Sequence, residues 1–430
     1  MTAITWIGYT TRYREGGAQM QRAAQTLARE RDAAGHRVCC EPIESKGDFS
    51  AAMRRLATSG DAIAELHLIT HSGMYGPMFG TTDWPEQFSP HEWRAMDLPL
   101  APGAAAWFHA CRSARWFAPF FARTFNVPAY GYHWYTTFST SPDRFRWEGP
   151  RPAPGAPLYV MGAPGQKSHG LTGSVLKYVF GRSEPLQRLD PVAADSSYDA
   201  VAEMYAAVFE DIRLRADEWA WLEARIPDGA RLLDIGCGNG ALLAQLSGRI
   251  ASGIGVDASG GQLLHAQQRT AAHGNLSFHQ VEGPQLPLPD HSIDVAVSML
   301  SWRYLDWDPL LRELARVLTP GGRLLIVDMA TSPAQARELP KMVTDKLRGL
   351  RVRWRHQGAR AALHRMVADE RWQEMLRYNP IRAEHEYRWY LESRFPGSAV
   401  EVLNIGWHAR VLAFDSGPFS DARLHDMHYP

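Results

Sequence analysis

Short apolar runs alternate with longer amphipathic stretches along the first third of the chain. The apolar runs predict five strands, at 4–9, 36–43, 62–70, 104–110 and 127–132. The stretches between them predict helices at 18–34, 49–60 and 113–125. This alternation is typical of a parallel sheet covered by helices on both faces, so we predict a doubly wound α/β domain.

The same rhythm restarts in the second half of the chain. A helix at 199–225 precedes apolar runs that predict strands beginning at 230, 253, 276, 293 and 322. Residues 331–396 break the rhythm with a helical segment rich in Arg and aromatic residues. Two strand-like runs follow within 400–417, on either side of Gly406. We therefore predict a second doubly wound domain with a helical insertion.

The segment between the two halves is rich in Pro and Gly and has no periodicity, beginning with "EGPRPAPGAP" at 148–157. Such composition is typical of a linker. We accordingly predict a first domain at 1–150, a linker at 151–195 and a second domain at 196–430, with the insertion at 331–396.

Composition excludes several classes of function. The 430 residues include 46 Lys and Arg and 46 Asp and Glu, so the formal net charge is zero and nothing favours nucleic acid as a partner. Four cysteines do not make a disulfide framework in a chain of this length, which indicates a reducing cytoplasm. No apolar run reaches 18 residues, and the N-terminus lacks a signal-peptide pattern, so we expect no membrane association.

The clearest chemical motif is "LLDIGCGNG" at 232–240, an apolar strand that ends in a glycine-rich turn. Three glycines at alternate positions allow a tight turn and close approach of a ligand, and the next helix presents free N–H groups. Asp257 ends the following strand, where a carboxylate can accept both hydroxyls of a ribose. A dinucleotide-binding dehydrogenase is the alternative, but its third glycine is replaced by Ala241.

Residues 197–417 resemble the class I S-adenosylmethionine-dependent methyltransferases. "LLDIGCGNG" looks like their first motif, "GVDAS" (255–259) like the acidic second-strand motif, and "RVLTPGG" (316–322) like the turn before their fifth strand. "YDAVAEMYAAVFEDIRLR" (198–215) resembles a lid helix of the ubiquinone-biosynthesis branch. The resemblance implies a Rossmann-like fold, S-adenosylmethionine as cofactor, and cofactor contacts from Tyr205, Asp234, Gly236, Cys237, Gly238, Asn239, Asp257, Ala258, Glu282, Gly283, Ser298 and Met299.

The insertion at 331–396 is the expected cover over the methyl acceptor. Its Arg and aromatic residues suit a small acceptor that is planar or bears a carboxylate, although they are equally compatible with a solvated helix. Candidate acceptor-binding residues are Trp302, Tyr304, His356 and Tyr387. The pattern predicts no metal site, and it leaves the acceptor atom open among O, N, C and S.

A weaker motif lies in the first half, where His71 and Cys111 follow two strands that we expect to be neighbours. A Cys–His pair at one sheet edge can form a thiolate nucleophile. Residues 3–135 resemble the caspase-like peptidase fold, which implies a flavodoxin-like strand order and makes His71 and Cys111 candidate catalytic residues. The sequence departs from that pattern because Ser72 separates His71 from Gly73 and because Ala110 precedes Cys111.

Three hypotheses about function remain open on the sequence. The chain is a small-molecule methyltransferase with an accessory N-terminal domain, a bifunctional methyltransferase and cysteine hydrolase, or a methyltransferase whose N-terminal module recruits a peptide or protein acceptor. In the first case Cys111 is a buried thiol and His71 a core histidine, as isolated examples usually are. The sequence does not fix the oligomeric state, and a homodimer is compatible with it.

Overall fold

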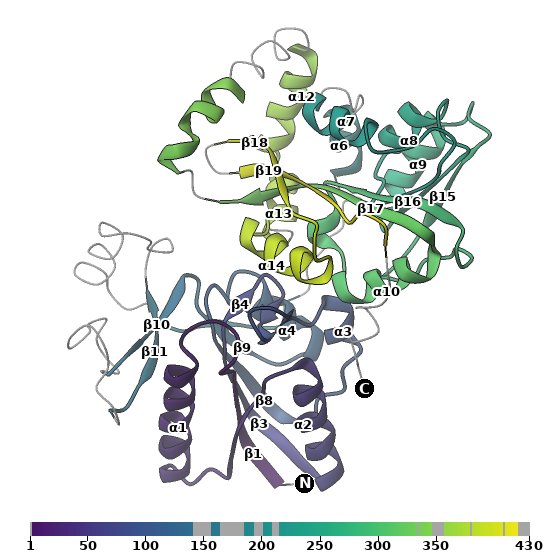
Figure 1. Ribbon diagram of the computed structural model, residues 1–430. Helices are drawn as coiled ribbons and strands as arrows, with labels where there is room; N and C mark the ends of the chain where they lie inside the picture. Colours follow the sequence, from purple (N-terminus) through teal and green to yellow (C-terminus); the bar gives the residue numbers. More distant parts are fainter. Residues whose placement is uncertain are drawn as a thin grey trace. The chain divides into compact units, whose positions relative to one another are not determined.

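The computed structural model describes residues 2–140, 156–163, 185–192, 201–208, 215–332, 335–345, 357–378, 381–406 and 409–419. The chain divides into two compact units, the first ending at Ala194 and the second running from Asp195 to Met427. Each unit has its own main sheet and its own hydrophobic core (Figure 1).

The first unit is built on a six-stranded sheet with the order β12-β9-β8-β3-β1-β2. The five strands other than β12 are parallel, and β12 pairs antiparallel with β9 at one edge. The parallel strands have the predicted flavodoxin-like order. The strands are β1 (Thr2–Tyr9), β2 (Val38–Pro42), β3 (Asp61–Ile69), β8 (Leu100–His109), β9 (Ala129–Gly131) and β12 (Gln187–Leu189).

Helices cover both faces of this sheet (Figure 1). Helix α1 (Gly17–Ala33) packs on the face that carries Ile7 and Ile69. Helices α2 (Lys46–Ser59), α3 (Pro90–Arg94) and α4 (Phe117–Phe125) pack on the other, larger core. Three short hairpins complete the unit: β4 (Ser72–Gly73) with β5 (Gly76–Pro77), β6 (Phe79–Gly80) with β7 (Pro85–Glu86), and β10 (Tyr135–Ser139) with β11 (Tyr159–Ala163).

The described parts of the predicted linker at 151–195 belong to the first unit rather than to a free connection. Strand β11 pairs with β10, and β12 extends the main sheet by pairing with β9. Neither short strand shows an alternating pattern of its own, because its hydrogen bonds come from a partner distant in sequence. The sequence analysis did not predict these two strands, because the segment is rich in Pro and Gly and the strands form only by pairing with β10 and β9.

The second unit has a seven-stranded sheet with the order β15-β14-β13-β16-β17-β19-β18. Strands β13 to β17 are parallel, whereas β19 is antiparallel to both of its neighbours. The order reverses between β13 and β16, which is where ligands bind in open sheets of this kind. The strands are β13 (Arg231–Ile235), β14 (Ser252–Asp257), β15 (Leu276–Gln280), β16 (Ile293–Met299), β17 (Leu318–Thr331), β18 (Glu401–Ile405) and β19 (Ala409–Asp415).

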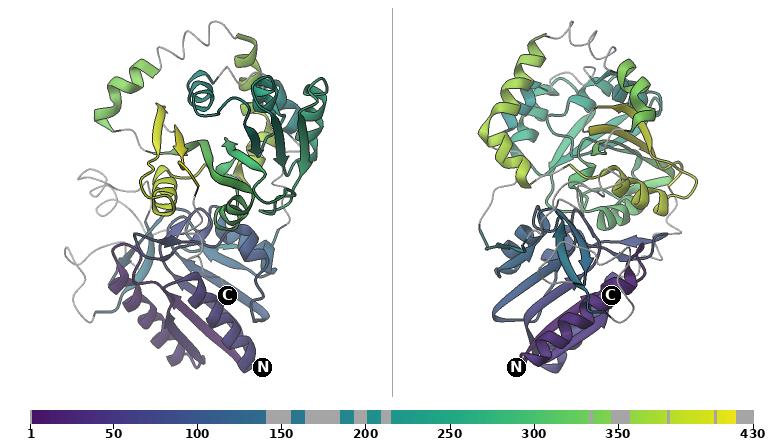
Figure 2. Two further views of the ribbon diagram at one scale, coloured as in Figure 1. Left: turned by 45° about the vertical axis from the view of Figure 1, so that its right-hand side comes forward. Right: turned by 90° about the vertical axis from the view of Figure 1, so that its left-hand side faces the viewer.

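Helices lie on both faces of the second sheet as well, as the further views in Figure 2 make clear. Helices α7 and α8 pack on the core formed by β13, β16 and β17, and α10 is joined to α14 by a hydrogen bond from Tyr390 to Asp308. The helices are α6 (Ala202–Val208), α7 (Ala216–Glu223), α8 (Ala241–Leu246), α9 (Gly260–Arg269), α10 (Trp307–Val317), α12 (Gln357–Ala368), α13 (Glu370–Tyr378) and α14 (Glu384–Arg394), with 3-10 turns η4 (Trp302–Tyr304) and η5 (Ala336–Glu338).

Candidate functional site

The turn after β13 requires glycine at three positions. Gly236, Gly238 and Gly240 all have positive φ angles, of 71°, 52° and 70°. A Cβ on Gly236 would lie 2.3 Å from the Cβ of Ser301, and one on Gly240 would lie 2.9 Å from that of Ala266. Around Gly238 there is more room, since the nearest atom to such a Cβ is 3.7 Å away. Close packing against Ser301 and Ala266 therefore requires glycine at the outer two positions. At Gly238 the neighbouring atoms leave the backbone more accessible.

Asp257 ties this turn to the end of β14. Its Oδ2 atom accepts the backbone N–H of Gly238 at 2.8 Å, and its Oδ1 atom accepts that of Ser259 at 2.9 Å. Hydrogen bonds to a carboxylate from two N–H groups fix its orientation and favour its charged form. The carboxylate is therefore held at the carboxyl edge of the sheet, and carboxylate oxygens are acceptors that suit the hydroxyls of a ribose.

A second carboxyl group lies inside the strand that leads into the turn. Asp234 is buried, and its burial together with the negative charge of Asp257 raises its pKa to about 8. The thiol of Cys237 is also buried, and burial raises its pKa well above the usual range. Both shifts favour the neutral forms of these groups, and a cation near Asp234 would shift it back toward its ionised form.

Tyr205, on α6, closes over the glycine turn. Its Cε1 atom is the nearest atom to the position of a Cβ on Gly238, and its ring stacks at 6.5 Å on that of Trp372 from α13. Burial raises the pKa of Tyr205, and the positive charges of Arg215 and Arg303 oppose this rise. Two guanidinium groups therefore lie near the tyrosine that covers the turn.

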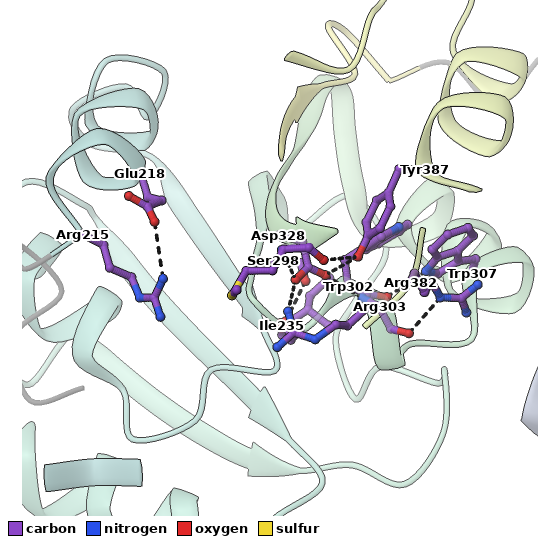
Figure 3. Close-up of polar contacts among 12 residues, drawn as sticks. Arg215, Glu218, Ile235, Ser298, Trp302, Arg303, Trp307, Asp328, Arg382 and Tyr387 are labelled. Atoms are coloured by element: carbon purple, nitrogen blue, oxygen red, sulfur yellow. Dashed lines mark hydrogen bonds and ion pairs between the residues drawn. The ribbon is translucent and has the colours of Figure 1, made fainter. Parts of the chain in front are cut away.

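The remaining predicted cofactor residues lie around the same edge. Ser298 shares a 2.7 Å hydrogen bond with Ser301, which donates to the carbonyl of Ile235 and so joins the ends of β16 and β13 (Figure 3). Asn239 is buried and accepts the N–H of Ala241. The other members have varied settings: Met299 is buried, Ala258 offers its carbonyl to Gln280, and Glu282 and Gly283 are exposed.

A buried polar cluster at the ends of β16 and β17 joins Tyr387, a predicted acceptor residue, to charged residues that the sequence analysis did not single out (Figure 3). Asp328 accepts the backbone N–H of Arg303 at 2.7 Å and is paired with its guanidinium. Tyr387 donates its hydroxyl to the same carboxylate at 2.9 Å. Arg382 donates to the carbonyl of Arg303 and lies 3.9 Å from the ring centre of Trp307. Contacts between η4, β17 and α14 carry no local pattern, so only the fold reveals this cluster.

The four predicted acceptor residues differ in position. Tyr304 follows Arg303, whose guanidinium lies 4.5 Å from the centre of its ring. Trp302 and Tyr387 are fully buried: Trp302 stacks on Trp307, and Tyr387 donates its hydroxyl to Asp328. His356 lies outside the described residues.

His71 and Cys111 come to the same edge of the first sheet, as the sequence predicted. Strands β3 and β8 are parallel neighbours with Ile69 opposite His109, so each candidate residue follows two positions later. His71 Nε2 lies 2.9 Å from the carbonyl oxygen of Glu15. Among the described residues, the Cys111 sulfur makes its hydrogen bonds with Thr136 at 3.3 Å and none with His71. The two residues are brought together but do not form a bonded pair.

Comparison with known proteins identifies the chemistry of the second unit. Residues 233–326, which include the glycine turn and Asp257, match the family model of a methyltransferase domain. The segment is thus similar to a methyltransferase domain. S-adenosylmethionine is the cofactor of that class, and the glycine turn and the bonded Asp257 carboxylate fit that molecule.

Curated relatives match the methyltransferase domain over a limited length. Methyltransferase GfsG of Streptomyces halstedii is 34% identical over 139 residues, which are 31% of this chain and 47% of that protein. A demethylmenaquinone methyltransferase of Bacillus licheniformis is 31% identical over 107 residues, 24% of this chain and 46% of that protein. The match therefore spans less than half the length of either relative.

The solved structures that match the chain include a methyltransferase from Aquifex aeolicus that depends on S-adenosylmethionine. It is 18% identical, and the superposition covers 52% of this chain and 99% of that one with a TM-score of 0.35.

Among the described helices, none combines the length and apolar character that crossing a bilayer requires. Within the same ranges, no group of three or more His, Cys, Asp and Glu side chains is arranged to hold a metal ion.

Proposed function

We propose that the protein transfers the methyl group of S-adenosylmethionine to a small-molecule acceptor that is planar or anionic, with the first unit as an accessory domain. The observation that carries the proposal is Asp257, held by two backbone N–H groups beside a glycine turn at the switch point of the sheet. Relatives of the domain are named as a demethylmenaquinone methyltransferase and a 27-O-demethylrifamycin SV methyltransferase.

The residues of the site have separate tasks in this reaction. S-adenosylmethionine supplies a methyl group on a sulfonium, which is already activated for displacement by the acceptor. Asp257 and the Gly238 turn hold the adenosyl portion, while Tyr205 covers the turn and excludes water. The protein contributes mainly by fixing its two ligands in line and by keeping water from between them.

Positive charge near the covering tyrosine supports an anionic or electron-rich planar acceptor. The charges of Arg215 and Arg303 both lower the pKa of Tyr205 against the effect of burial, and Arg303 is paired with the carboxylate of Asp328. A guanidinium oriented in this way can pair with a carboxylate or phenolate of the acceptor. Tyr387 then acts as a positioning residue, because it holds Asp328 and does not reach the surface.

Binding of S-adenosylhomocysteine, the reaction's product, tests the proposal. Replacement of Asp257 by Asn removes the charge and places an amide beside two N–H donors, so we expect affinity to fall by at least about a hundredfold. Calorimetry measures the affinity, and Asp228→Asn, at an exposed ion pair with Arg249, is the matched control. Equal affinity in the wild type and the Asp257 variant would contradict the proposal.

A second candidate function concerns the first unit, for which the caspase-like resemblance suggests a cysteine hydrolase. Support comes from the parallel pairing of β3 and β8, which brings His71 and Cys111 to one edge. If His71 Nε2 donates to the Glu15 carbonyl, Nδ1 is the basic nitrogen of that tautomer. The N–H of Thr136 points at the Cys111 sulfur and would stabilise a thiolate.

Alkylation with iodoacetamide tests this second function. Burial raises the pKa of Cys39 and Cys237 and, together with the charge of Cys39, that of Cys40 to about 11, so those three thiols should react slowly at pH 7.5. A nucleophilic Cys111 should react at least ten times faster, and His71→Ala should slow it. Equal labelling of all four thiols, read by peptide mass spectrometry, would leave the hydrolase without support.

A further inference from the structure

Gln262, in the first turn of α9, is a buried side chain that the proposed function has not used. Only 2% of the residue is exposed. Neither its Oε1 nor its Nε2 atom has a hydrogen-bond partner among the described residues. A buried carboxamide left in that state is unfavourable, and such groups are rare in native proteins, so this one calls for a specific explanation.

The local sequence explains why this side chain is available. Ser259 caps α9 by accepting the N–H of Gln262, and a Gln at this third helical position normally returns its side chain to the N–H of the cap. Here Asp257 takes the N–H of Ser259 at 2.9 Å, so the reciprocal bond of the capping box is already replaced. The Gln262 carboxamide is therefore not needed for the capping-box hydrogen bond to the backbone N–H of Ser259.

The Gln262 side chain turns toward the glycine turn. Gln262 Oε1 lies 3.9 Å from the position that a Cβ on Gly238 would occupy, and Tyr205 Cε1 lies 3.7 Å from the same point. The N–H of Gly238 is bonded to Asp257 Oδ2. Carboxamide, carboxylate and tyrosine ring therefore surround one small region above the middle glycine.

We propose that Gln262 binds a ribose hydroxyl of the cofactor, as the neutral partner of Asp257. A hydroxyl is both donor and acceptor, so its proton can go to the Asp257 carboxylate while its oxygen accepts an N–H of Gln262. The inference rests on the proposed function and adds to it a residue that selects ribose over deoxyribose. It also explains the buried amide, which gains its partner when the cofactor binds.

The test uses the full chain with the substitution Gln262→Met, which keeps side-chain length and removes both amide atoms. We expect affinity for S-adenosylhomocysteine to fall about tenfold, because a hydrogen bond to the ligand is lost. The melting temperature without ligand should stay equal or rise, since an unsatisfied buried amide has been removed. A purely structural role would instead lower the melting temperature and leave affinity unchanged. Gln267→Met, at an exposed position of the same helix, is the control.

The 2′-deoxy and 3′-deoxy analogues of S-adenosylhomocysteine decide which group is bound. For the wild type, one of them should bind at least tenfold more weakly than the parent, and Gln262→Met should reduce that difference to the part that Asp257 contributes. If the variant weakens all three ligands by the same factor, the amide does not contact the ribose and the inference is wrong. A wild type that binds none of them would overturn the proposed function as well.

Discussion

At the scale of single residues, two carboxyl groups in the same site have opposite electrostatic settings. Asp257 receives two N–H groups at the edge of the sheet, whereas Asp234 is enclosed in strand β13 with its pKa raised to about 8. At neutral pH most Asp234 is therefore protonated, and a positively charged ligand nearby shifts it toward the ionised form. Binding of a sulfonium should then release a proton.

Affinity for S-adenosylmethionine is expected to rise with pH because of this coupling. Below pH 8 the free protein carries the Asp234 proton and the complex tends to lose it, so affinity increases by up to tenfold per pH unit and levels off above pH 8. Titrations at pH 6, 7 and 8 measure the slope. Asp234→Asn should flatten it, and an unchanged slope in that variant would assign the effect to another group.

At the scale of elements, β3 and β8 carry a buried polar chain on one face of the first sheet. His67 Nδ1 lies 3.1 Å from His109 Nε2, and its Nε2 atom lies 3.3 Å from Glu65, which also pairs with Arg31 of α1. His67 stacks on Trp107 at 4.6 Å. Burial lowers the pKa of His67, and it lowers that of His109 to about 3.

Acid should destabilise the first unit through this chain. The pKa of each histidine is lower in the folded state than in the unfolded state, where it is near 6.5, so the unfolded state binds more protons and stability falls as pH drops below 6.5. The hydrogen bond from His67 lowers the pKa of Glu65 to about 2, which extends the loss below pH 4.5. Each neutral histidine contributes up to about 1.4 kcal/mol per pH unit.

The substitution His67→Phe separates this effect from general acid sensitivity. The ring keeps its stacking on Trp107 and cannot take up a proton, so urea denaturation should show a smaller loss of stability between pH 6.5 and 5 than in the wild type. The exposed residue His91 provides the control substitution His91→Asn. A stability that does not change over this range in the wild type would contradict the account of the buried chain.

At the scale of the whole molecule, the sequence predicted both sheets and the ligand-binding edge of the second. Apolar runs and glycine turns are local signals, so β13, its turn and Asp257 were found from the chain alone. Strands β11 and β12 were missed, because their pairing partners are distant in sequence. The Asp328 cluster and the role of Gln262 were not predicted either, because both depend on contacts between side chains that are distant in sequence.

The central claim is that the turn at Gly238 and the carboxylate of Asp257 bind the adenosyl group of S-adenosylmethionine rather than a nicotinamide dinucleotide. Titration calorimetry of the full chain, with S-adenosylhomocysteine in one series and NAD⁺ in another, tests it most directly. The account predicts one binding site per chain for S-adenosylhomocysteine and no heat with NAD⁺. Saturable binding of NAD⁺, or no binding of S-adenosylhomocysteine, would contradict it.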